Sequence, residues 1–381
     1  MIEGTCDARF APVREAFAAN FAERGERGAA VCVSVGGRVV ADLWGGTAAD
    51  DPSRARPWGP DTLVNVFSVG KGLSALLAAR LMDDGRLDAD APVVRYWPEF
   101  GKAGKEALTV RHVLSHQAGL PALRRRMAPG TMLDHAAMAA ALAEQEPWWE
   151  PGTAHGYHVN TFGFLLGEIV RRATGRTVGA LLREEIAAPL AADVHIGLPH
   201  SEHHRVAEFG WQDAPPEDDR SGDLDDDRLM EYNAYFNPGG LSGMGVINTR
   251  AWREAELPST NAHASARGVA RVYTALAAGG GLNGTRVVSK DALAAATTEQ
   301  VSGQDLVLRR PSRFALGFQL TQPERPFGPN PRSFGHFGAG GSLGFCDPDC
   351  GVAFGYVMNE MGPRWQNPRN RALMDALYAS L

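Results

Sequence analysis

Patterns typical of strands gather at the two ends of this chain, and helical patterns fill most of the middle. Near the N-terminus, apolar runs at 29–35 and 38–44 flank Gly36-Gly37, a dipeptide typical of a tight hairpin turn. Towards the C-terminus, four further runs are typical of strands: 314–320, 333–338, 341–346 and 352–358. A single antiparallel sheet built from both ends of the chain pairs all of these strands.

Helices are predicted between and around these strands. Their patterns lie at 9–23, from Ser68 to Gly85, from Thr109, at 161–174, at 264–278 and at 370–380. We therefore expect an α+β protein with two structural units. Residues 1–95 and 250–381 form the sheet domain, and residues 96–249 form a mostly helical domain inserted over it.

Composition places the chain among globular proteins and excludes several classes of partner. It has 381 residues, of which 44% are hydrophobic and 22% are charged, and its net charge is −6. The negative charge argues against a nucleic-acid partner. No apolar run approaches the ~18 residues of a membrane helix. Residues 1–7 lack the basic and apolar regions of a signal peptide, so we expect a cytoplasmic protein without a membrane anchor.

No metal or cofactor is expected from the sequence. The four cysteines fit no metal-binding pattern. Cys346 and Cys350 span a predicted hairpin turn and can close a small loop if oxidised, but a reducing cytosol favours free thiols. Three histidines between residues 200 and 204 lack a second ligand cluster, which favours a solvated loop. The acidic stretch 213–228 is interpreted as a surface loop.

A serine and a lysine three residues apart are the first candidates for catalysis. Only four of the 38 basic residues are lysines, and Lys71 follows Ser68 by three positions. Arginine cannot accept a proton in a protein, whereas a lysine with a lowered pKa can. Residues i and i+3 share one helix face, so the Ser68 hydroxyl and the Lys71 amine can meet as nucleophile and base.

The surroundings of this pair favour a helix that begins at Ser68. Apolar residues recur at helical spacing after it, and Gly85 is a plausible C-cap. The first N–H groups of a helix can bind a developing oxyanion. Alternatively, Ser68 is only an N-cap and Lys71 a solvated first-turn residue, although a lysine there opposes the helix dipole. Roughly 0.17 such matches are expected by chance, so the spacing needs support from other residues.

Tyr157 and a glycine-rich stretch are candidates for the remaining parts of a serine hydrolase. Tyr157 lies in a loop just before the helix at 161–174. Held near a charged Lys71, its pKa is expected to fall, which suits a proton carrier. The alternative is an ordinary half-buried aromatic residue. Residues 335–342 are rich in glycine and can bring a backbone N–H close to an acyl group; the alternative is a bulged strand.

Ser342 is a second serine in a known catalytic motif. Residues 340–344 match G-x-S-x-G, which requires a strand-to-helix turn at the serine. Both flanks are typical of strands here, and 44 glycines make a chance match easy. We therefore reject Ser342 as the nucleophile.

Taken together, these segments resemble the class C β-lactamase-like superfamily of serine hydrolases, and most closely its carboxylesterase branch, the family VIII esterases. The resemblance rests on the order of four segments: Phe67 to Lys71, Leu114 to Pro121, Gly156 to His158 and His336 to Gly338. It implies a fold like that of β-lactamases and penicillin-binding proteins, in which an antiparallel sheet flanked by helices meets a mostly helical domain at the active site.

The resemblance also implies a role for particular residues. Ser68 is the nucleophile, Lys71 its base partner and Tyr157 a second general base. The backbone N–H groups of Ser68 and Ala339 form the oxyanion hole. Four residues are expected to bind substrate: His158, Asn160, His336 and Gly338.

Two departures from the β-lactamase pattern bear on the substrate. Val159 stands where those enzymes have an asparagine, and the nearest asparagine is Asn160. His336 replaces the strand lysine that helps to bind the β-lactam carboxylate. A mostly neutral histidine attracts a carboxylate less well than lysine does. Both changes favour neutral esters over β-lactams.

We therefore expect a serine hydrolase that cleaves short-chain carboxylic esters through an acyl-enzyme, with a small-molecule ester as its partner. Three alternatives share the fold: an acyltransferase, an amidase and a β-lactamase. A fourth is a sensor or binding module that is acylated without turnover. The presence of Tyr157 argues against the sensor.

Overall fold

The computed structural model describes residues 1–49, 55–211 and 224–381. The helices are α1 Ala11–Glu23, α2 Val69–Asp83, α3 Val110–Leu114, α4 His135–Glu144, α5 Thr161–Thr174, α6 Val178–Leu182, α7 Ala188–Leu190, α8 Asp226–Phe236, α9 Arg250–Glu254, α10 Ala266–Ala277, α11 Lys290–Thr297 and α12 Pro368–Ala379. The strands are β1 Ile2–Cys6, β2 Gly28–Val35, β3 Arg38–Ala49, β4 Arg56–Pro57, β5 Val64–Asn65, β6 Val194–His195, β7 His263–Ala264, β8 Gly281–Leu282, β9 Thr285–Arg286, β10 Val301–Gln304, β11 Pro311–Phe314, β12 Gln319–Leu320, β13 Phe334–Phe337, β14 Leu343–Asp347 and β15 Val352–Met358.

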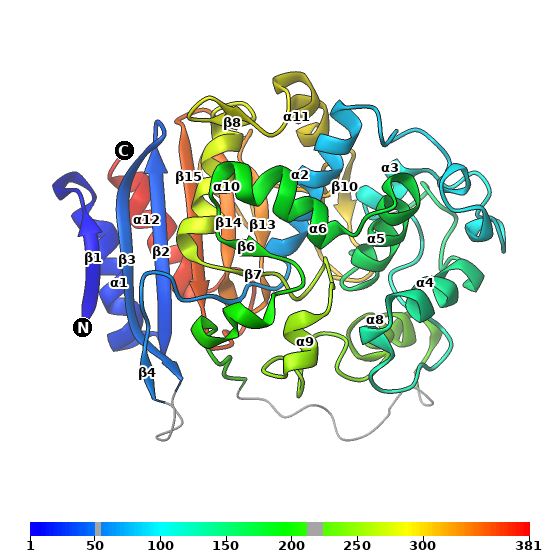
Figure 1. Ribbon diagram of the computed structural model, residues 1–381, viewed down its shortest axis with the longest axis horizontal. Helices are drawn as coiled ribbons and strands as arrows, with labels where there is room; N and C mark the ends of the chain where they lie inside the picture. Colours follow the sequence, from blue (N-terminus) through cyan, green and yellow to red (C-terminus); the bar gives the residue numbers. More distant parts are fainter. Residues whose placement is uncertain (50–54, 212–223) are drawn as a thin grey trace.

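A ten-stranded antiparallel sheet forms the centre of the molecule (Figure 1). Its order is β1-β3-β2-β15-β14-β13-β12-β11-β10, with β4 paired to β3 outside this path. The N-terminal hairpin joins the C-terminal strands where β2 pairs with β15, with Val35 opposite Val352. The prediction of an α+β fold with one sheet built from both ends of the chain is confirmed.

The hairpin between β2 and β3 turns at the predicted glycines. Gly36 and Gly37 have φ values of 57° and 80°. A tight turn that matches the twist of the strands needs two positive φ angles in succession, which glycine adopts at little cost. The two strands then pair from Gly28 to Val35 with one irregularity after Val33.

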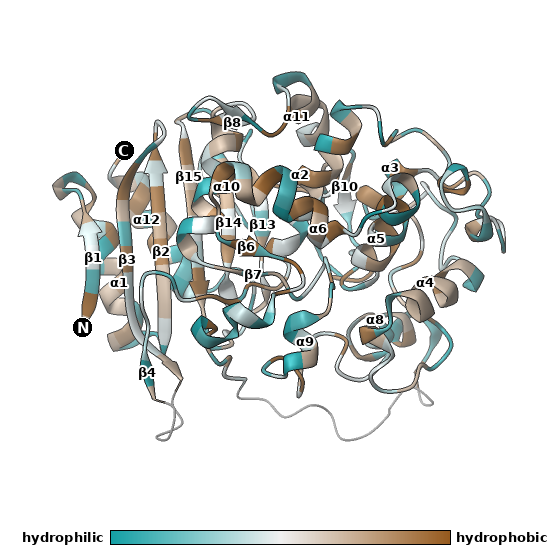
Figure 2. Cartoon of the chain, viewed as in Figure 1, coloured by the Kyte–Doolittle hydropathy of each residue, from teal (hydrophilic) through white to brown (hydrophobic). Residues whose placement is uncertain are grey.

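Helices cover both faces of the sheet. On one face α1 and α12 pack against each other, and on the other α10 packs against β2, β14 and β15. The strand β15 is buried along its whole length because it lies between these layers, and Figure 2 shows its largely hydrophobic colouring. Helix α2 lies against β13 and β14.

Some predicted elements were wrong. The run 314–320 is not one strand, because residues 315–318 form a turn between β11 and β12, with Gly317 at a φ of 83°. Its apolar residues are buried in the turn. Strands β1 and β10 were not predicted. Most of the acidic stretch 213–228 lies outside the described residues, but its last part begins α8, where the Asp225 carboxylate caps the helix by accepting from the Arg228 amide at 2.9 Å.

The helices between the two halves of the sheet gather towards one end of the molecule. In Figure 1, α3, α4, α5 and α8 lie at the end opposite to β1. The division into a sheet domain of residues 1–95 and 250–381 and a helical domain of residues 96–249 stays a prediction.

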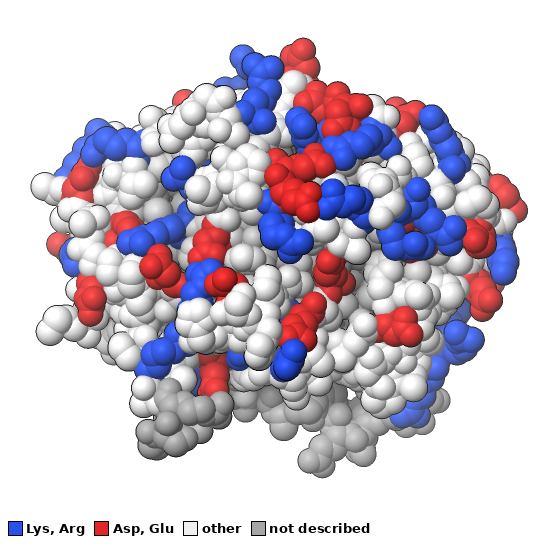
Figure 3. All heavy atoms as spheres, viewed as in Figure 1, with Lys and Arg blue, Asp and Glu red and all other residues white. Residues whose placement is uncertain are grey.

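Three further features concern the charge on one face of the molecule, its helices and its cysteines. On the face drawn in Figure 3, acidic and basic side chains are interspersed. Among the described residues, no helix has the length and apolarity needed to cross a bilayer. All four cysteines, Cys6, Cys32, Cys346 and Cys350, are free in the structure.

Candidate active site

Ser68 lies at the sharp entrance to α2. The preceding Phe67 is buried and has a φ of 49°, a left-handed conformation that is rare for a bulky residue and costs of order 1–3 kcal/mol. Edge-on contacts with Phe209 and Trp211, at ring-centroid distances of 5.1 and 6.1 Å, hold its side chain. The helix then buries its leucines and ends before Gly85, whose φ is 77°. The predicted helix is confirmed, and Ser68 is the residue that directly precedes its first turn.

Lys71 is fully buried beside Ser68. Its Nζ lies 3.2 Å from the Ser68 hydroxyl, 2.5 Å from the Val159 carbonyl oxygen and 3.0 Å from the Ser259 carbonyl oxygen. Burial lowers the pKa of Lys71 well below its ordinary value. A neutral amine has two N–H groups and one lone pair. Because both carbonyls only accept hydrogen bonds, they take the two N–H groups and leave the lone pair facing the Ser68 O–H.

Tyr157 forms the wall of this site. It is fully buried, and Lys71 Nζ lies 4.8 Å from the centre of its ring. Its hydroxyl makes no hydrogen bond to any described residue. The expectation of a lowered Tyr157 pKa is wrong: burial raises it well above its ordinary value, and the neighbouring Ser68 side chain opposes this shift only in part. With its pKa raised in this way, the Tyr157 hydroxyl keeps its proton at neutral pH.

Asp305 holds the backbone of Tyr157 in place and was missed by the sequence analysis. Its carboxylate accepts from the Tyr157 amide at 3.0 and 3.1 Å, one distance to each oxygen. It also accepts from the amides of Val307 and Leu308 and from the Ser312 hydroxyl. Asp305 is fully buried in the turn between β10 and β11. No motif marks it, because Tyr157 is 148 residues away in the chain.

Three neutral histidines surround the Lys71 amine. Burial lowers the pKa of His336 and that of His158 to about 3, and it lowers the pKa of His116 well below its ordinary value. The prediction of a neutral His336 is confirmed. Its Nδ1 lies 2.7 Å from the Phe337 carbonyl oxygen, and its Nε2 has no partner among the described residues. The Nε2 of His116 also has no partner among the described residues. His336 and His116 are therefore the two histidines of this group with a ring nitrogen left for a ligand.

His158 and Asn160 are engaged by the protein itself. The Nδ1 of His158 lies 2.6 Å from the Gly156 carbonyl oxygen, and its Nε2 accepts from the Leu120 amide at 3.0 Å. Asn160 donates to the Ala234 carbonyl at 2.8 Å and accepts from the Thr260 hydroxyl at 2.6 Å. Both side chains tie the Tyr157 loop to its surroundings, and their contact with substrate stays a prediction.

The glycine-rich strand end lies against the start of α2. A Cβ on Gly338 would stand 2.4 Å from the Val66 carbonyl oxygen, so only glycine allows the two backbones to approach this closely. Ala339 follows in a short 3₁₀ turn. The serine of the G-x-S-x-G stretch, Ser342, lies between that turn and β14 and not at the start of a helix. Ser342 is fully buried, and its exclusion as the nucleophile stays a prediction.

Aromatic and aliphatic side chains pack around Tyr157. Tyr157 belongs to a hydrophobic cluster separate from the main core, whose buried members are Ala122, Tyr157, Val159, Met230, Ala234, Val307 and Phe314. Trp148, Trp149, Tyr235 and Trp365 pack on it and are partly exposed. Apolar walls of this kind suit small organic substrates.

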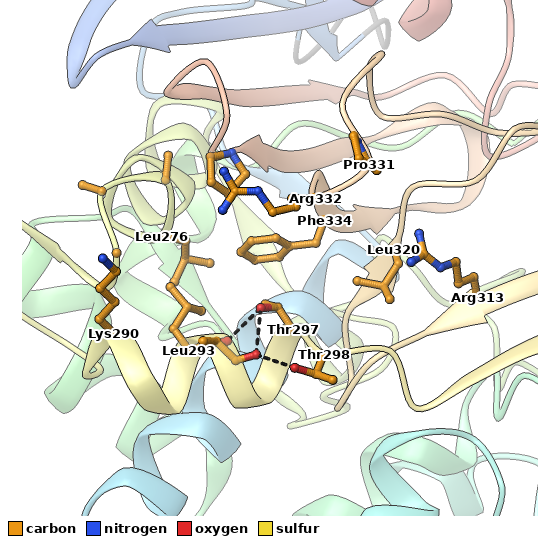
Figure 4. Close-up of a pocket in the computed structure, with 15 residues that line it drawn as sticks. Leu276, Lys290, Leu293, Thr297, Thr298, Arg313, Leu320, Pro331, Arg332 and Phe334 are labelled. Atoms are coloured by element: carbon orange, nitrogen blue, oxygen red, sulfur yellow. Dashed lines mark hydrogen bonds between the residues drawn. The ribbon is translucent and has the colours of Figure 1, made fainter.

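A pocket of about 620 Å³ lies elsewhere, between α10, α11 and strands β12 and β13 (Figure 4). Figure 4 shows Leu276, Leu293 and Phe334 along it. Two of its basic side chains are already paired, Arg313 with Glu299 and Arg332 with Asp349. It contains none of the residues around Ser68.

One group among the described residues offers three metal-ligand atoms close together. Atoms of His200, His203 and Glu254 lie within 4.8 Å of one another. The histidines belong to a 3₁₀ turn at His200–Arg205, not to the loop expected from the sequence. The Glu254 carboxylate is already paired with Arg250 at 2.8 Å.

Comparison with known proteins identifies the family. The beta-lactamase family model matches residues 13–379. Esterase/beta-lactamase LipL of Mycobacterium tuberculosis is 36% identical over 368 residues, which cover 94% of this chain and 83% of that protein. A penicillin-binding protein homologue from Caulobacter crescentus is 44% identical with a TM-score of 0.91, and a family VIII carboxylesterase is 42% identical with a TM-score of 0.90. Both structures match over 100% of each chain. The chain therefore belongs to the beta-lactamase family.

Proposed function

We propose that this protein is a serine hydrolase that cleaves short-chain carboxylic esters through an acyl-enzyme on Ser68. The observation that carries the proposal is the Lys71 amine, which donates to two carbonyls and lies 3.2 Å from the Ser68 hydroxyl. A buried neutral amine in this position is a base for the serine. Relatives named esterase and carboxylesterase support the ester as substrate.

The first half-reaction transfers the acyl group to Ser68. Lys71 Nζ accepts the Ser68 proton while Oγ attacks the ester carbonyl, and the amides of Ser68 and Ala339 receive the negative charge on oxygen. Tyr157 donates its hydroxyl proton to the departing alkoxide. The Lys71 ammonium then returns a proton to Tyr157, which restores both neutral groups and leaves the alcohol and the acyl-enzyme.

The second half-reaction releases the acid. A water molecule takes the place of the alcohol and attacks the acyl carbonyl while the Tyr157 and Lys71 pair accepts its proton. Collapse of the intermediate returns a proton to Ser68 Oγ. An acyltransferase differs only in the nucleophile of this step, so an alcohol added in excess distinguishes the two activities. The cytoplasmic location and the absence of nucleic-acid and membrane partners remain predictions.

The neutral His336 supports esters over β-lactams. A β-lactam carboxylate that meets a neutral imidazole in place of an ammonium loses a charge-assisted contact worth about 1.5–3 kcal/mol. We expect 4-nitrophenyl butyrate to exceed a chromogenic cephalosporin by at least ~10²-fold in kcat/KM. A preference for the cephalosporin would contradict the esterase proposal and favour a β-lactamase.

Labelling with a fluorophosphonate tests the nucleophile. Intact mass is expected to show one adduct on the wild type and on Ser342→Ala, and none on Ser68→Ala. The Ser68 side chain makes no capping hydrogen bond at the start of α2, so Ser68→Ala should stay folded. An adduct that persists in Ser68→Ala, or that disappears in Ser342→Ala, would assign the reaction to another residue.

A further inference from the structure

Arg310 is a basic side chain at the edge of the site that no described acid pairs with. It ends the turn between β10 and β11, and its carbonyl accepts from the Asp305 amide at 3.1 Å. Its guanidinium lies over the Trp365 ring, with Cζ 4.9 Å from the ring centre. The arginines nearby differ: Arg309 pairs with Asp227 and Glu231, and Arg313 pairs with Glu299.

Trp365 connects Arg310 to the reacting groups. Its ring packs edge-on against Tyr157, with the ring centres 5.0 Å apart. The Asn370 side-chain amide donates both to the Trp365 carbonyl at 2.7 Å and to the Gly341 carbonyl at 2.9 Å. This ties Trp365 to the turn that begins at Ala339. The guanidinium is thus separated from Tyr157 by one aromatic ring.

Asp305 does not neutralise this charge by direct contact. Its two oxygens are occupied by three backbone amides and the Ser312 hydroxyl, and no ion pair to Arg310 forms. Burial lowers the pKa of Arg310, and the nearby Arg364 adds to this effect. The Tyr235, Asp305 and Tyr157 side chains act in the opposite direction. Arg325 also lies close enough that the two cations disfavour each other. Partly buried guanidinium groups without a carboxylate contact favour an anion from outside.

We propose that Arg310 binds an anionic group of the substrate, so that the esters preferred by this enzyme carry a carboxylate near the scissile bond. This inference rests on the proposed esterase function and names its substrate class. The proposed site differs from the β-lactamase pattern. Its positive charge belongs to Arg310, in the turn between β10 and β11, whereas the β-lactamase pattern has a lysine at the position of His336.

Paired esters that differ only in charge test the inference. For the acyl side, mono-4-nitrophenyl glutarate is compared with 4-nitrophenyl 4-carbamoylbutyrate. For the alcohol side, 4-carboxyphenyl acetate is compared with 4-carbamoylphenyl acetate. The measured quantity is the ratio of kcat/KM for the anionic ester to that for its neutral partner, in the wild type, Arg310→Gln, Arg310→Lys and the matched control Arg309→Gln.

The ratio is expected to fall 10- to 100-fold in Arg310→Gln for at least one pair, which corresponds to about 1.4–2.7 kcal/mol. Arg310→Lys should keep most of the wild-type ratio, and Arg309→Gln should leave the ratio unchanged. Added salt should reduce the wild-type ratio only for the ester pair whose anionic member binds Arg310. A ratio that stays within twofold in Arg310→Gln for both pairs would overturn the inference. A wild type that hydrolyses none of the four esters would overturn the proposed function itself.

Discussion

Two of the four lysines are buried in closely similar surroundings, yet we assign chemistry to only one. Lys105 donates to the Lys102 carbonyl at 2.8 Å and to the Gln145 carbonyl at 2.6 Å, and its Nζ lies 5.2 Å from the Phe100 ring. Lys71 also donates to two carbonyls and lies over an aromatic ring. Burial lowers both pKa values, that of Lys105 to about 8.

The two lysines differ in the groups that face the amine besides the two carbonyls. The Lys71 Nζ lies 3.2 Å from the Ser68 hydroxyl, and the ring beside it is that of a tyrosine, Tyr157, which carries a hydroxyl. The ring beside Lys105 is that of a phenylalanine, which carries none. A buried lysine with a lowered pKa is therefore a structural arrangement that the fold uses twice. It becomes a candidate base only where a nucleophile and a second proton carrier meet it.

The largest expected effect comes from replacing each lysine by arginine. Lys71→Arg keeps the charge but cannot accept a proton, so kcat for 4-nitrophenyl butyrate should fall about 10³-fold or more. Lys105→Arg should stay within about threefold. Circular dichroism and thermal unfolding check that both variants fold.

The pH profile sharpens the same comparison. A protonated Lys71 cannot accept the Ser68 proton, so kcat/KM should fall as the pH drops through the Lys71 pKa. Because burial lowers that pKa, this acidic limb should lie well below the pH at which an exposed lysine titrates. Lys105→Met should leave the acidic limb in place. Retention of more than half of kcat in Lys71→Arg would reduce Lys71 to an electrostatic role.

Removing the hydroxyl from the ring over Lys71 should produce the next largest effect. Tyr157→Phe makes this ring resemble the one beside Lys105. We expect a loss of at least ~10² in kcat, the usual scale for a general acid–base residue. Fluorophosphonate labelling of the variant checks that Ser68 remains reactive. A loss below about threefold would remove Tyr157 from the proton path.

Weakening the support of Tyr157 should have a smaller effect. Asp305→Asn replaces one acceptor oxygen by a donor that opposes the backbone amides around it. We expect kcat to fall about tenfold, with KM within about threefold, because one buried contact to a charged group is changed. The pH profile should keep its shape. A change confined to KM would place Asp305 in substrate binding.

The smallest expected effect concerns stability at Lys105. Its pKa is about 8 when folded and is higher in the unfolded chain, so unfolding takes up a proton between these values. Raising the pH from about 8 towards 10 therefore favours the folded state at this residue. Chemical denaturation at several pH values should show a shallower rise for Lys105→Met than for the wild type. Equal slopes would mean that Lys105 keeps an ordinary pKa.

Local features of this protein could be predicted from its sequence, and distant contacts could not. Ser68 and Lys71 share one helix turn, so their meeting follows from spacing alone. The scarcity of lysine among the basic residues of this chain did not by itself single out Lys71, since a second lysine, Lys105, is also buried. The direction of the Tyr157 pKa was wrong because burial is a property of the folded chain.

Residues joined across the chain had no signal in the sequence. Asp305, Arg310 and Trp365 reach Tyr157 from loops far away in the sequence, and none belongs to a motif. The run at 314–320 was assigned to a strand because apolar burial in a turn gives the same composition as burial in a sheet. Fold class and the central pair were therefore predictable, but the support of the site was not.

The pairing of β2 with β15 also determines when a newly made molecule becomes an enzyme. A ribosome delivers Ser68 and Lys71 well before β13, Ala339 and β15, which is the partner of β2. Until Met358 has emerged, β2 has a free edge, and the groups proposed to bind the oxyanion are not assembled. Such long-range pairing is slow compared with local folding. Each molecule should therefore gain activity in one late step, after these strands have paired.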